Sequence, residues 1–394
     1  MRFLLSAGEA SGDTYGAQLI DALHQLSPAS ASQPAPTFFG MGGEKMQAAG
    51  CELLVHANEV AVVGLVEVLT HLPGIRRRFK HLLAEAARRK PDAAILIDFP
   101  DFNLRLAREL HKLGIPVFYF VSPQIWAWRT GRVKQIQKYV RKMIVIFPFE
   151  QEFYRRHGVE VSYVGHPLAY VAPPQISREE FAAKHGLDAR KQWIALLPGS
   201  RKKELAFNIE RMLSAAEELQ TEIGDFEFIL PVASTLNKEW LQQKLYRDWA
   251  APIRVTLTDN ARASLMHARA AVVASGTATV EAALSGTPFV VVYRLAPLTW
   301  FLGRRLVKLD TFAMPNLIVG KKIVPELIQS GFTANTVFQE LKAIIPDGPA
   351  RRQMQDALKM VQERLRDSHT IGDGQQIDSP ALRASREILE SLKK

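Results

Sequence analysis

The stretch AAVVASGTATVEAALSGTP (270–288) is an apolar strand pattern that breaks at Ser275-Gly276-Thr277 and turns into a helix. A strand that leads directly into a helix is the repeating unit of doubly wound α/β folds. At such a turn, free backbone N–H groups and the positive end of the helix dipole point at one spot and make an anion site. Glu281 lies one turn into the helix, where its carboxylate can accept hydrogen bonds from a ribose. A diphosphate beside a ribose is a nucleotide, so we assign to a nucleotide site the residues Ser275, Gly276, Thr277, Thr279 and Glu281.

A second strand-to-helix turn, LLPGSRKKE (196–204), lies upstream in the same half of the chain. Gly199 permits a close backbone approach, Ser200 follows it, and Arg201 can contact a phosphate bidentately. Taken alone, this turn is equally well explained as an ordinary helix start with an exposed basic end. Because two anion sites in one domain suit a diphosphate, we favour phosphate binding by these three residues.

Strand and helix patterns alternate along the chain, and the strands are continuous apolar runs, which predicts parallel sheets covered on both faces. The Gly- and Pro-rich stretch 165–174 interrupts the alternation, which then restarts. We therefore predict an α/β protein of two doubly wound, Rossmann-like domains that face a cleft, over 1–168 and 169–370. A helix over about 378–394 is expected to pack back on the first domain or on a partner subunit. The predicted strands are 3–5, 93–97, 117–121, 143–146, 162–164, 193–197, 226–230, 254–256, 270–274 and 289–292; the predicted helices of the first half are 15–26, 103–113, 132–139 and 150–157.

The composition is that of a globular protein, since 47% of the 394 residues are hydrophobic and 23% are charged. No apolar run is long enough to span a bilayer, and MRFLLSAGEASGD (1–13) turns polar too early for a signal peptide. Cys51 is the single cysteine, so an internal disulfide is impossible. We expect a cytoplasmic protein. Its net charge of +10 favours an anionic partner, which is a membrane surface, nucleic acid or a phosphorylated substrate.

The motifs of several common nucleotide and metal sites are missing from the sequence. No GxxxxGK[ST] loop is present, and neither GEASGD (8–13) nor GMGGEK (40–45) has the GxGxxG spacing of dinucleotide sites. Asp-x-Asp, which holds the metal-bound diphosphate in many glycosyltransferases, does not occur. There is no HExxH and no cysteine cluster. We therefore expect no metal and no cofactor.

A candidate catalytic carboxylate lies in ILIDFPDFN (95–103), where Asp98 comes just past a strand end. A carboxylate there can act as a general base towards a hydroxyl nucleophile. The alternative is that Asp98 or Asp101 caps the helix that begins near Asn103. Asp101 is the better placed cap, which leaves Asp98 for chemistry.

The loop GEASGD (8–13) follows the first strand and suits contact with a polar ligand. We assign it to the acceptor side of the site through Glu9, Ser11, Gly12 and Asp13, although a helix N-cap is the default explanation for Asp13.

In FVSPQIWAWR (120–129), Pro123 fixes the turn after a strand and Gln124 is the candidate ligand contact. Trp126 and Trp128 are more often packing residues than stacking platforms.

The stretch 60–80 combines apolar residues with a basic end, as an interfacial membrane contact requires. A buried helix with a solvated basic end explains it equally well. A second such stretch, LTWFLGRRLVK (298–308), favours the membrane, whereas nucleic acid ranks low because few aromatic residues lie between the charges. The predicted membrane contacts are Val66, Leu69, Leu72, Ile75, Arg76, Arg77 and Arg78.

In their order along the chain, these strings resemble the lipid-A-disaccharide synthase family, a group of GT-B glycosyltransferases. The resemblance runs from residue 1 to about 330, and 371–380 departs from it as an insertion. The strings that carry it are GEASGD (8–13), GMGGEKM (40–46), VGLVEVL (63–69), DFPDFN (98–103), FVSPQIWAW (120–128), FPFEQEFY (147–154), VGHPL (164–168), LPGSRKKE (197–204), ASGTATVEAALSGTP (274–288), MPNLI (314–318) and VPELIQ (324–329).

The resemblance implies an inverting transfer of a glycosyl group. The donor would be UDP-2,3-diacylglucosamine, the acceptor 2,3-diacylglucosamine 1-phosphate (lipid X), and the products the β(1→6) disaccharide 1-phosphate and UDP. Asp98 would be the general base, Arg201 would bind the diphosphate, and Asn316 in MPN would lie near the nucleotide or the donor sugar. The enzyme would work as a peripheral protein on the cytoplasmic surface of the inner membrane, and a homodimer through the C-terminal tail stays open. The alternatives are a UDP-N-acetylglucosamine 2-epimerase of the same fold and a non-catalytic lipid-binding protein.

Overall fold

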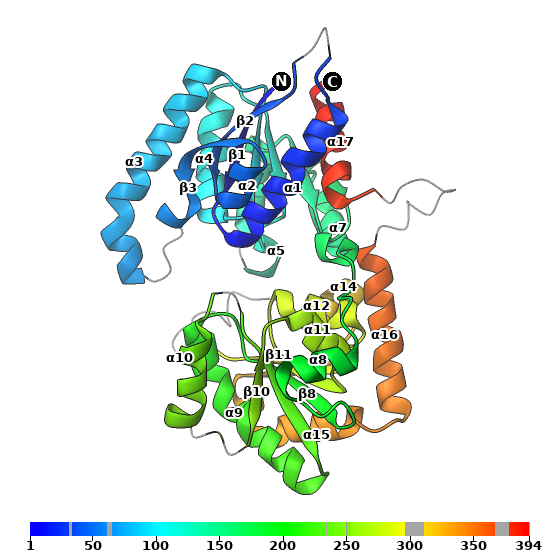
Figure 1. The fold of residues 1–394 in the computed structure, drawn as a ribbon. Helices are drawn as coiled ribbons and strands as arrows, with labels where there is room; N and C mark the ends of the chain where they lie inside the picture. The colour runs from blue at the N-terminus through cyan, green and yellow to red at the C-terminus, as the bar shows by residue number, and fades with distance from the viewer. Residues whose placement is uncertain are drawn as a thin grey trace. The chain divides into compact units, whose positions relative to one another are not determined.

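The computed structural model describes residues 1–30, 34–60, 65–128, 130–233, 235–249, 251, 253–295, 311–366 and 378–393, and for 65–71, 128 and 130 it describes the backbone alone. The chain forms two compact units, unit 1 (Met1–Tyr170 with Asp367–Lys394) and unit 2 (Val171–Arg366). Each unit is a parallel sheet with helices packed on its faces, which confirms the predicted doubly wound α/β class (Figure 1).

The described part of unit 1 contains a seven-stranded sheet in the order β3-β2-β1-β4-β5-β6-β7. The chain winds outward from β1 to β3, returns past β1 to β4 and then continues to β7, so the direction of winding reverses between β1 and β4. The strands are β1 (Arg2–Ala7), β2 (Thr37–Gly42), β3 (Cys51–His56), β4 (Ala93–Ile97), β5 (Val117–Phe120), β6 (Lys142–Val145) and β7 (Val161–Tyr163). The helices are α1 (Ala10–Leu26), α2 (Glu44–Ala48), α3 (Leu65–Arg89), α4 (Pro100–Lys112), α5 (Ile125–Trp128), α6 (Val133–Tyr139), α7 (Pro148–Arg156) and α17 (Pro380–Lys393).

Several elements of unit 1 differ from the predicted ones. Strands β2 and β3 were missed, because β2 contains glycines that resemble a loop. A Cβ atom at Gly40 would lie 1.9 Å from the Leu5 carbonyl oxygen, so this glycine is what lets β2 lie against β1. Helix α3 continues through Pro73. Helix α4 begins at Pro100 and not near Asn103, so the prediction that Asp101 caps it is wrong; Asp101 forms an ion pair with Arg132.

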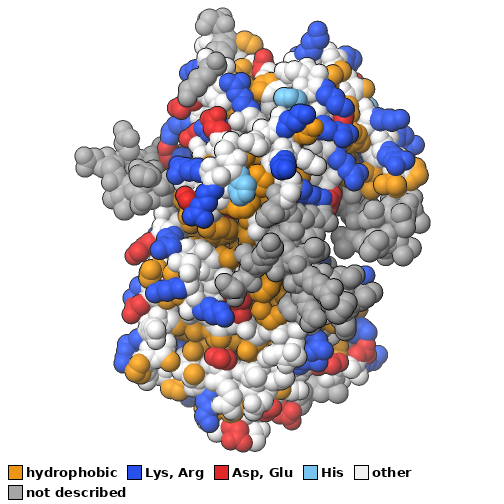
Figure 2. Space-filling model, turned by 180° about the vertical axis from the view of Figure 1, so that it is seen from behind, with side chains coloured by type: hydrophobic (Ala, Val, Ile, Leu, Met, Phe, Trp, Pro, Cys, Tyr) orange, Lys and Arg blue, Asp and Glu red, His pale blue; other side chains and the backbone are white. Residues whose placement is uncertain are grey.

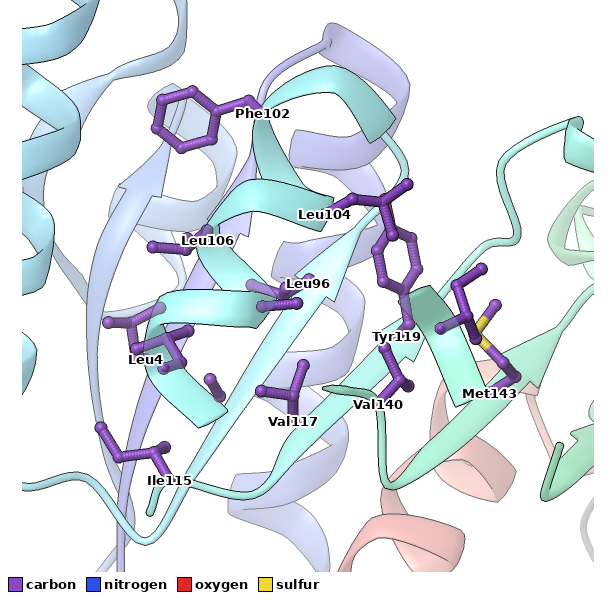
Figure 3. Close-up of a cluster of buried hydrophobic side chains, with 14 of the residues drawn as sticks. Leu4, Leu96, Phe102, Leu104, Leu106, Ile115, Val117, Tyr119, Val140 and Met143 are labelled. Atoms are coloured by element: carbon purple, nitrogen blue, oxygen red, sulfur yellow. The ribbon is translucent and has the colours of Figure 1, made fainter. Parts of the chain in front are cut away.

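Two hydrophobic clusters cover the two faces of the unit 1 sheet. One includes Leu4 and Leu96 and is closed by α3, α4 and α6 (Figure 3), and the other includes Leu5 and Ile95 and is closed by α1 and α17. Successive residues of β1 and β4 therefore point into opposite clusters, which is why these strands are apolar throughout. Helix α17 packs against α1 of its own chain, and Glu387 pairs with Lys142 at 2.5 Å.

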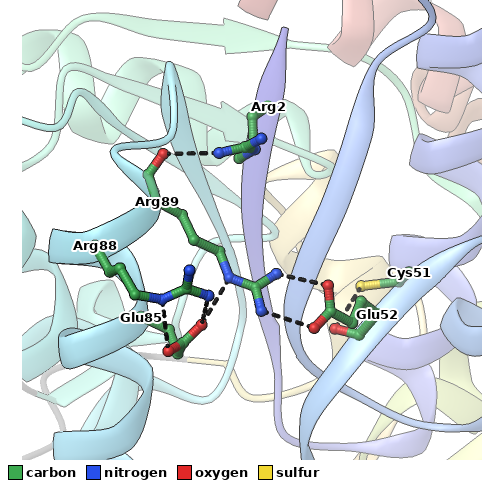
Figure 4. Close-up of polar contacts among 6 residues, drawn as sticks. All are labelled: Arg2, Cys51, Glu52, Glu85, Arg88 and Arg89. Atoms are coloured by element: carbon green, nitrogen blue, oxygen red, sulfur yellow. Dashed lines mark hydrogen bonds and ion pairs between the residues drawn. The ribbon is translucent and has the colours of Figure 1, made fainter.

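Charged side chains tie the end of α3 to the edge of the sheet. The guanidinium of Arg89 donates to both carboxylate oxygens of Glu52 on β3, at 2.6 and 2.7 Å, and its Nε donates to Glu85 at 2.7 Å (Figure 4). The Arg89 carbonyl accepts from Arg2 at 3.0 Å. Pairs near the surface contribute about 0–1 kcal/mol each, so this cluster fixes the position of α3 more than it stabilises the fold.

The described part of unit 2 contains a six-stranded sheet in the order β10-β9-β8-β11-β12-β13, which reverses its winding between β8 and β11. The strands are β8 (Gln192–Leu197), β9 (Phe226–Pro231), β10 (Val255–Thr258), β11 (Ala270–Ala274), β12 (Phe289–Tyr293) and β13 (Glu326–Ile328). The helices are α8 (Arg178–His185), α9 (Lys202–Glu222), α10 (Lys238–Gln243), α11 (Ala261–His267), α12 (Thr277–Ser285), α14 (Met314–Val319), α15 (Ala334–Ile344) and α16 (Pro349–Leu365). Among the described helices of both units, none is long and apolar enough to cross a membrane.

Candidate functional site

The two predicted anion loops of unit 2 come together at the point where its sheet reverses direction. Strands β8 and β11 are neighbours, with Leu197 paired to Val273, so their carboxyl ends lie side by side. The loop 198–201 leaves one end and the loop 275–277 leaves the other. In open α/β sheets, ligands bind outside the carboxyl ends of the strands at such a switch point. The arrangement therefore offers one ligand two helix N-termini, those of α9 and α12.

The turn before α12 uses some of its polar groups internally. Gly276 has φ 146°, a conformation that side chains rarely permit, and it places Thr277 at the helix start. The Ser275 N–H donates to the Val292 carbonyl at 2.9 Å, and the Thr279 hydroxyl donates to the Gly276 carbonyl at 2.7 Å. Both of these donors are used within the protein, while contacts of Ser275 and Thr279 with the nucleotide stay a prediction. The N–H groups at the helix start are the predicted anion donors.

Glu204 holds the loop before α9 and was not predicted. Its carboxylate accepts from the Ser200 N–H at 3.2 Å and lies 3.4 Å from the Arg201 guanidinium. A Cβ atom at Gly199, where φ is 124°, would lie 2.7 Å from the same carboxylate. Arg201 is the N-cap residue of α9, and its side chain is 61% exposed, so it can turn to a phosphate at little cost. The sequence feature that could have indicated Glu204 is its place in the first turn of α9.

Glu281 lies on α12, where burial raises the pKa of its carboxyl group and nearby Arg262 opposes the rise. By contrast, Asn316 is fully buried and makes four hydrogen bonds within unit 2. Its Nδ2 donates to the Val324 carbonyl and to Glu326, and its Oδ1 accepts from the N–H groups of Ile323 and Val324, at 2.6–3.0 Å. The side chain of Asn316 thus binds the turn that leads into β13, and its place near the nucleotide or the donor sugar stays a prediction.

In unit 1, the candidate base lies at the corresponding switch point, between β1 and β4. Ala7 pairs with Ile97 at the ends of these strands, so Gly8 and Asp98 follow at the same edge of the sheet. Asp98 and Phe99 have φ angles of 45° and 50°, although neither is glycine. Such left-handed residues cost about 1–3 kcal/mol each and cluster at functional sites. The ring of Phe99 lies over Gly8, where an added Cβ atom would come within 2.3 Å of it.

The environment of Asp98 suits a general base. Burial raises the pKa of its carboxyl group from 3.8 to about 6, with a smaller contribution from Glu9, while a hydrogen bond from the Phe99 backbone lowers it. A carboxyl with this pKa is mostly ionised at neutral pH and still accepts a proton readily.

The GEASGD loop (8–13) contains both exposed residues and buried residues with structural contacts. Glu9 and Ser11 are exposed, whereas Gly12 is buried, where an added Cβ atom would touch the Ala7 side chain at 3.3 Å. Gly12 therefore serves the packing of α1 on the sheet. Asp13 is buried, and its carboxylate accepts three backbone hydrogen bonds at the start of α2; its contact with the acceptor stays a prediction. The donors are the N–H groups of Gly43, Lys45 and Met46, at 2.7–3.1 Å.

Beyond β5, Gln124 is exposed in the loop before α5, as a ligand contact requires. Trp126 is a packing residue, since its ring meets that of Phe149 and its Nε1 donates to Glu150 at 3.1 Å. Glu150 was not predicted. It is 1% exposed, and burial raises the pKa of its carboxyl group to about 8, so it is largely protonated at neutral pH.

The predicted membrane contacts lie on α3 and have different environments. Leu72, Arg76 and Arg77 line an open hollow of about 480 Å³ together with Pro73 and Lys80. Ile75 is partly buried and packs against the buried cluster, and Arg78 donates to Glu59 at 2.6 Å; their contact with a membrane stays a prediction. Figure 2 shows lysine and arginine side chains gathered on this side of unit 1, with hydrophobic side chains beside them. The side chains of Val66 and Leu69, and all of 298–308, lie outside the described residues.

Within the described part of the chain, no group of three or more His, Cys, Asp and Glu side chains is placed to hold a metal ion.

Solved structures define the class of the fold. The UDP-GlcNAc 2-epimerase from Neisseria meningitidis bound to UDP-GlcNAc superposes with a TM-score of 0.58 at 13% identity, over 100% of both chains. The calicheamicin glycosyltransferase CalG4 superposes with a TM-score of 0.59 at 14% identity, over 100% of this chain and 98% of that one. The chain thus has the GT-B type of fold, which glycosyltransferases share with these epimerases.

Sequence relatives define the family. Residues 3–377 match the profile of lipid-A-disaccharide synthetase. The lipid-A-disaccharide synthase of Koribacter versatilis is 54% identical over 389 residues, covering 99% of this chain and 98% of that protein. That of Acidobacterium capsulatum is 49% identical over 374 residues, covering 92% and 91%. The chain belongs to the lipid-A-disaccharide synthase family, as the ordered motifs predicted.

Proposed function

We propose that the chain is an inverting glycosyltransferase that joins UDP-2,3-diacylglucosamine to 2,3-diacylglucosamine 1-phosphate. The products are the β(1→6)-linked disaccharide 1-phosphate and UDP. The observation that supports the proposal is that polar side chains and helix ends suited to the two reactants lie at the switch points of the two sheets. Unit 2 places Arg201 and the start of α12 at β8 and β11, where they suit a diphosphate. Unit 1 places Asp98 between β1 and β4, where it suits a hydroxyl nucleophile.

The reaction is a single displacement at C1 of the donor sugar. Asp98 takes the proton of the acceptor 6-hydroxyl while O6 forms its bond to C1. The bond from C1 to the phosphate oxygen breaks, and its electron pair leaves with UDP. Arg201 and the N–H groups at the start of α12 stabilise the negative charge that develops on the diphosphate. One displacement turns the α-linked donor into a β-linked product.

The two units divide the substrates between them in this proposal. Unit 2 binds the UDP-sugar, with Glu281 at the ribose, and unit 1 binds the acceptor, with Glu9, Ser11 and Gln124 near it. Both substrates carry acyl chains, and each methylene buried in a bilayer contributes about 0.8 kcal/mol to membrane retention. The enzyme therefore works as a peripheral protein on the cytoplasmic face of the inner membrane. The homodimer through the tail stays a prediction, since α17 packs on its own chain.

The membrane contact predicts a specific loss of binding. We expect Arg76→Gln with Arg77→Gln to weaken binding to anionic liposomes about 30-fold, because each basic residue at the surface contributes about 1 kcal/mol. Both side chains are exposed beside the hollow lined by Leu72. Liposome sedimentation at low and high salt measures the effect, which should shrink as salt screens the charges.

A matched control removes two exposed cations from another helix of unit 1, through Arg155→Gln with Arg156→Gln on α7. The net charge of the two double variants is identical. Equal binding of the two double variants to anionic liposomes would contradict a membrane contact through α3. Binding would then depend only on the overall charge of the protein.

The activity itself is tested by a product assay with both acylated substrates. We expect disaccharide 1-phosphate and UDP in equal amounts, and no UDP when the acceptor is omitted. Incubation with UDP-N-acetylglucosamine alone distinguishes the 2-epimerase alternative, because only an epimerase acts without an acceptor. A lipid-binding protein would release no UDP under any of these conditions.

A further inference from the structure

The main chain of Asp98 is held by buried side chains that do not belong to the substrate site. Its carbonyl oxygen accepts hydrogen bonds from the Tyr119 hydroxyl at 2.6 Å and from Asn103 Nδ2 at 2.8 Å. Its N–H donates to the Phe120 carbonyl at 3.1 Å. Tyr119 and Asn103 are both fully buried, and they reach Asp98 from β5 and from α4. The peptide groups on both sides of the Asp98 Cα atom are therefore fixed.

Asn103 extends this support to the neighbouring strand β1. Its Oδ1 accepts from the Ser6 hydroxyl at 2.6 Å, and its Nδ2 also reaches the carbonyl oxygens of Ser6 and Ile97, each at 3.2 Å. The three strands around the switch point, β1, β4 and β5, are thus connected through the carbonyl group of Asp98.

The hydroxyl of Tyr119 has a use that packing does not explain. Its ring belongs to the buried cluster between the sheet and α4 (Figure 3), where a phenylalanine would fill the same space. A buried hydroxyl has to find a partner, and the partner here is the carbonyl of a residue in a left-handed conformation. The hydrogen bond from the Tyr119 hydroxyl therefore favours the left-handed backbone conformation of Asp98, which sets the direction of the Asp98 side chain.

We propose that Tyr119 and Asn103 are positioning residues, which hold Asp98 in its left-handed conformation so that its carboxyl group meets the acceptor hydroxyl. This inference rests on the role of Asp98 as general base in the proposed function. Neither side chain contacts substrate; each acts through the Asp98 peptide.

The test is Tyr119→Phe, which removes one oxygen atom and leaves Asn103 on the carbonyl. We expect kcat to fall about tenfold, the size of one lost hydrogen bond, with KM unchanged for both substrates. The acid limb of the kcat–pH profile should move to lower pH, because an Asp98 carboxyl that is less well held becomes more hydrated. In an Asp98→Asn background, Tyr119→Phe should change the residual rate by less than about twofold.

Tyr154→Phe is the matched control, because this buried tyrosine of unit 1 donates or accepts one hydrogen bond, with Ser122 at 2.8 Å, away from the Asp98 peptide. It should lower the melting temperature about as much as Tyr119→Phe and leave kcat unchanged. Equal kcat values for Tyr119→Phe and the unmodified protein would overturn the inference, as would an equal loss of kcat in both tyrosine variants.

Two further variants keep the outcome decisive. Ser6→Ala removes the hydrogen bond that orients Asn103, so this variant should also have a lower kcat. Full activity of Ser6→Ala would count against the inference even if Tyr119→Phe folds poorly. An inactive Asp98→Asn beside a fully active Tyr119→Phe would overturn the positioning role alone. Normal turnover by Asp98→Asn would overturn the general-base role and the inference with it.

Discussion

Asp98→Asn is expected to lower kcat by about 10²–10⁴-fold, the usual contribution of a general base. The substitution keeps the size of the side chain but removes its ability to accept the proton of the 6-hydroxyl. Because the predicted diphosphate contacts lie in unit 2, the affinity for UDP should stay within about twofold. Initial rates with both acylated substrates, together with calorimetric titration of UDP, measure the two effects.

The pH dependence of the reaction provides the second part of this prediction. Burial raises the pKa of Asp98 to about 6, so the rate should rise with pH through this value and level off above it. Asp101→Asn is the control, because Asp101 lies on the same turn of chain and pairs with Arg132 at the surface. Comparable losses of kcat in Asp98→Asn and Asp101→Asn would contradict the assignment of Asp98 as the general base. So would a rate that still falls below about pH 6 in Asp98→Asn.

Glu150→Gln is expected to change how the stability of the protein depends on pH. The carboxyl group of Glu150 has a pKa raised by burial from 4.5 to about 8 in the folded state. The unfolded chain releases this proton near pH 4.5, so ionisation favours unfolding increasingly between pH 4.5 and 8. The stabilising contribution of the neutral carboxyl is complete below pH 4.5 and is lost as the pH rises to about 8. The loss is about 3–5 kcal/mol over this range.

A glutamine at position 150 cannot ionise, so urea midpoints measured at pH 5 and pH 8 should differ less in the variant. At pH 5 the variant should be the less stable protein, because an NH2 group that cannot accept replaces one of the two Glu150 oxygen atoms. These oxygens accept from Trp126 Nε1 at 3.1 Å and from the Phe147 N–H at 3.2 Å. Glu152→Gln is the control, since Glu152 is exposed on the same helix and pairs with Arg156 at 2.7 Å. If the urea midpoints at pH 5 and pH 8 differ as much in Glu150→Gln as in the unmodified protein, Glu150 is already ionised in the folded protein.

The parts of the fold that follow from local patterns could be predicted from the sequence. Continuous apolar strands alternating with helices indicated two doubly wound sheets, whereas ligand binding at the strand ends before Ser275 and Asp98 stays a prediction. The spatial order of the strands could not be predicted, because β2 and β3 lack the pattern of a buried strand. That order is what brings the end of β1 beside that of β4.

The surroundings of the site residues could not be predicted, and the physical cause is common to them. A polar side chain such as Asp13 or Asn316 has the same appearance in a sequence whether it binds a ligand or a neighbouring loop. Asp13 accepts from backbone groups about thirty residues away, and Asn316 binds a turn that lies seven to ten residues ahead. Glu150 is the opposite case, a buried carboxyl group that the sequence analysis did not single out. Its burial depends on contacts with Trp126 that no local pattern indicates. The left-handed backbone of Asp98 and Phe99 likewise has no sequence signature, since neither residue is glycine.

The proposed reaction is one direct displacement, with Asp98 as the base and UDP as the leaving group. The most direct test is the anomeric configuration of the product formed from a donor labelled with ¹³C at C1, read from the one-bond carbon–proton coupling of the new glycosidic carbon. We predict a β-linked disaccharide, formed in equal amount with UDP. An α-linked product, or UDP released without disaccharide, would contradict the account.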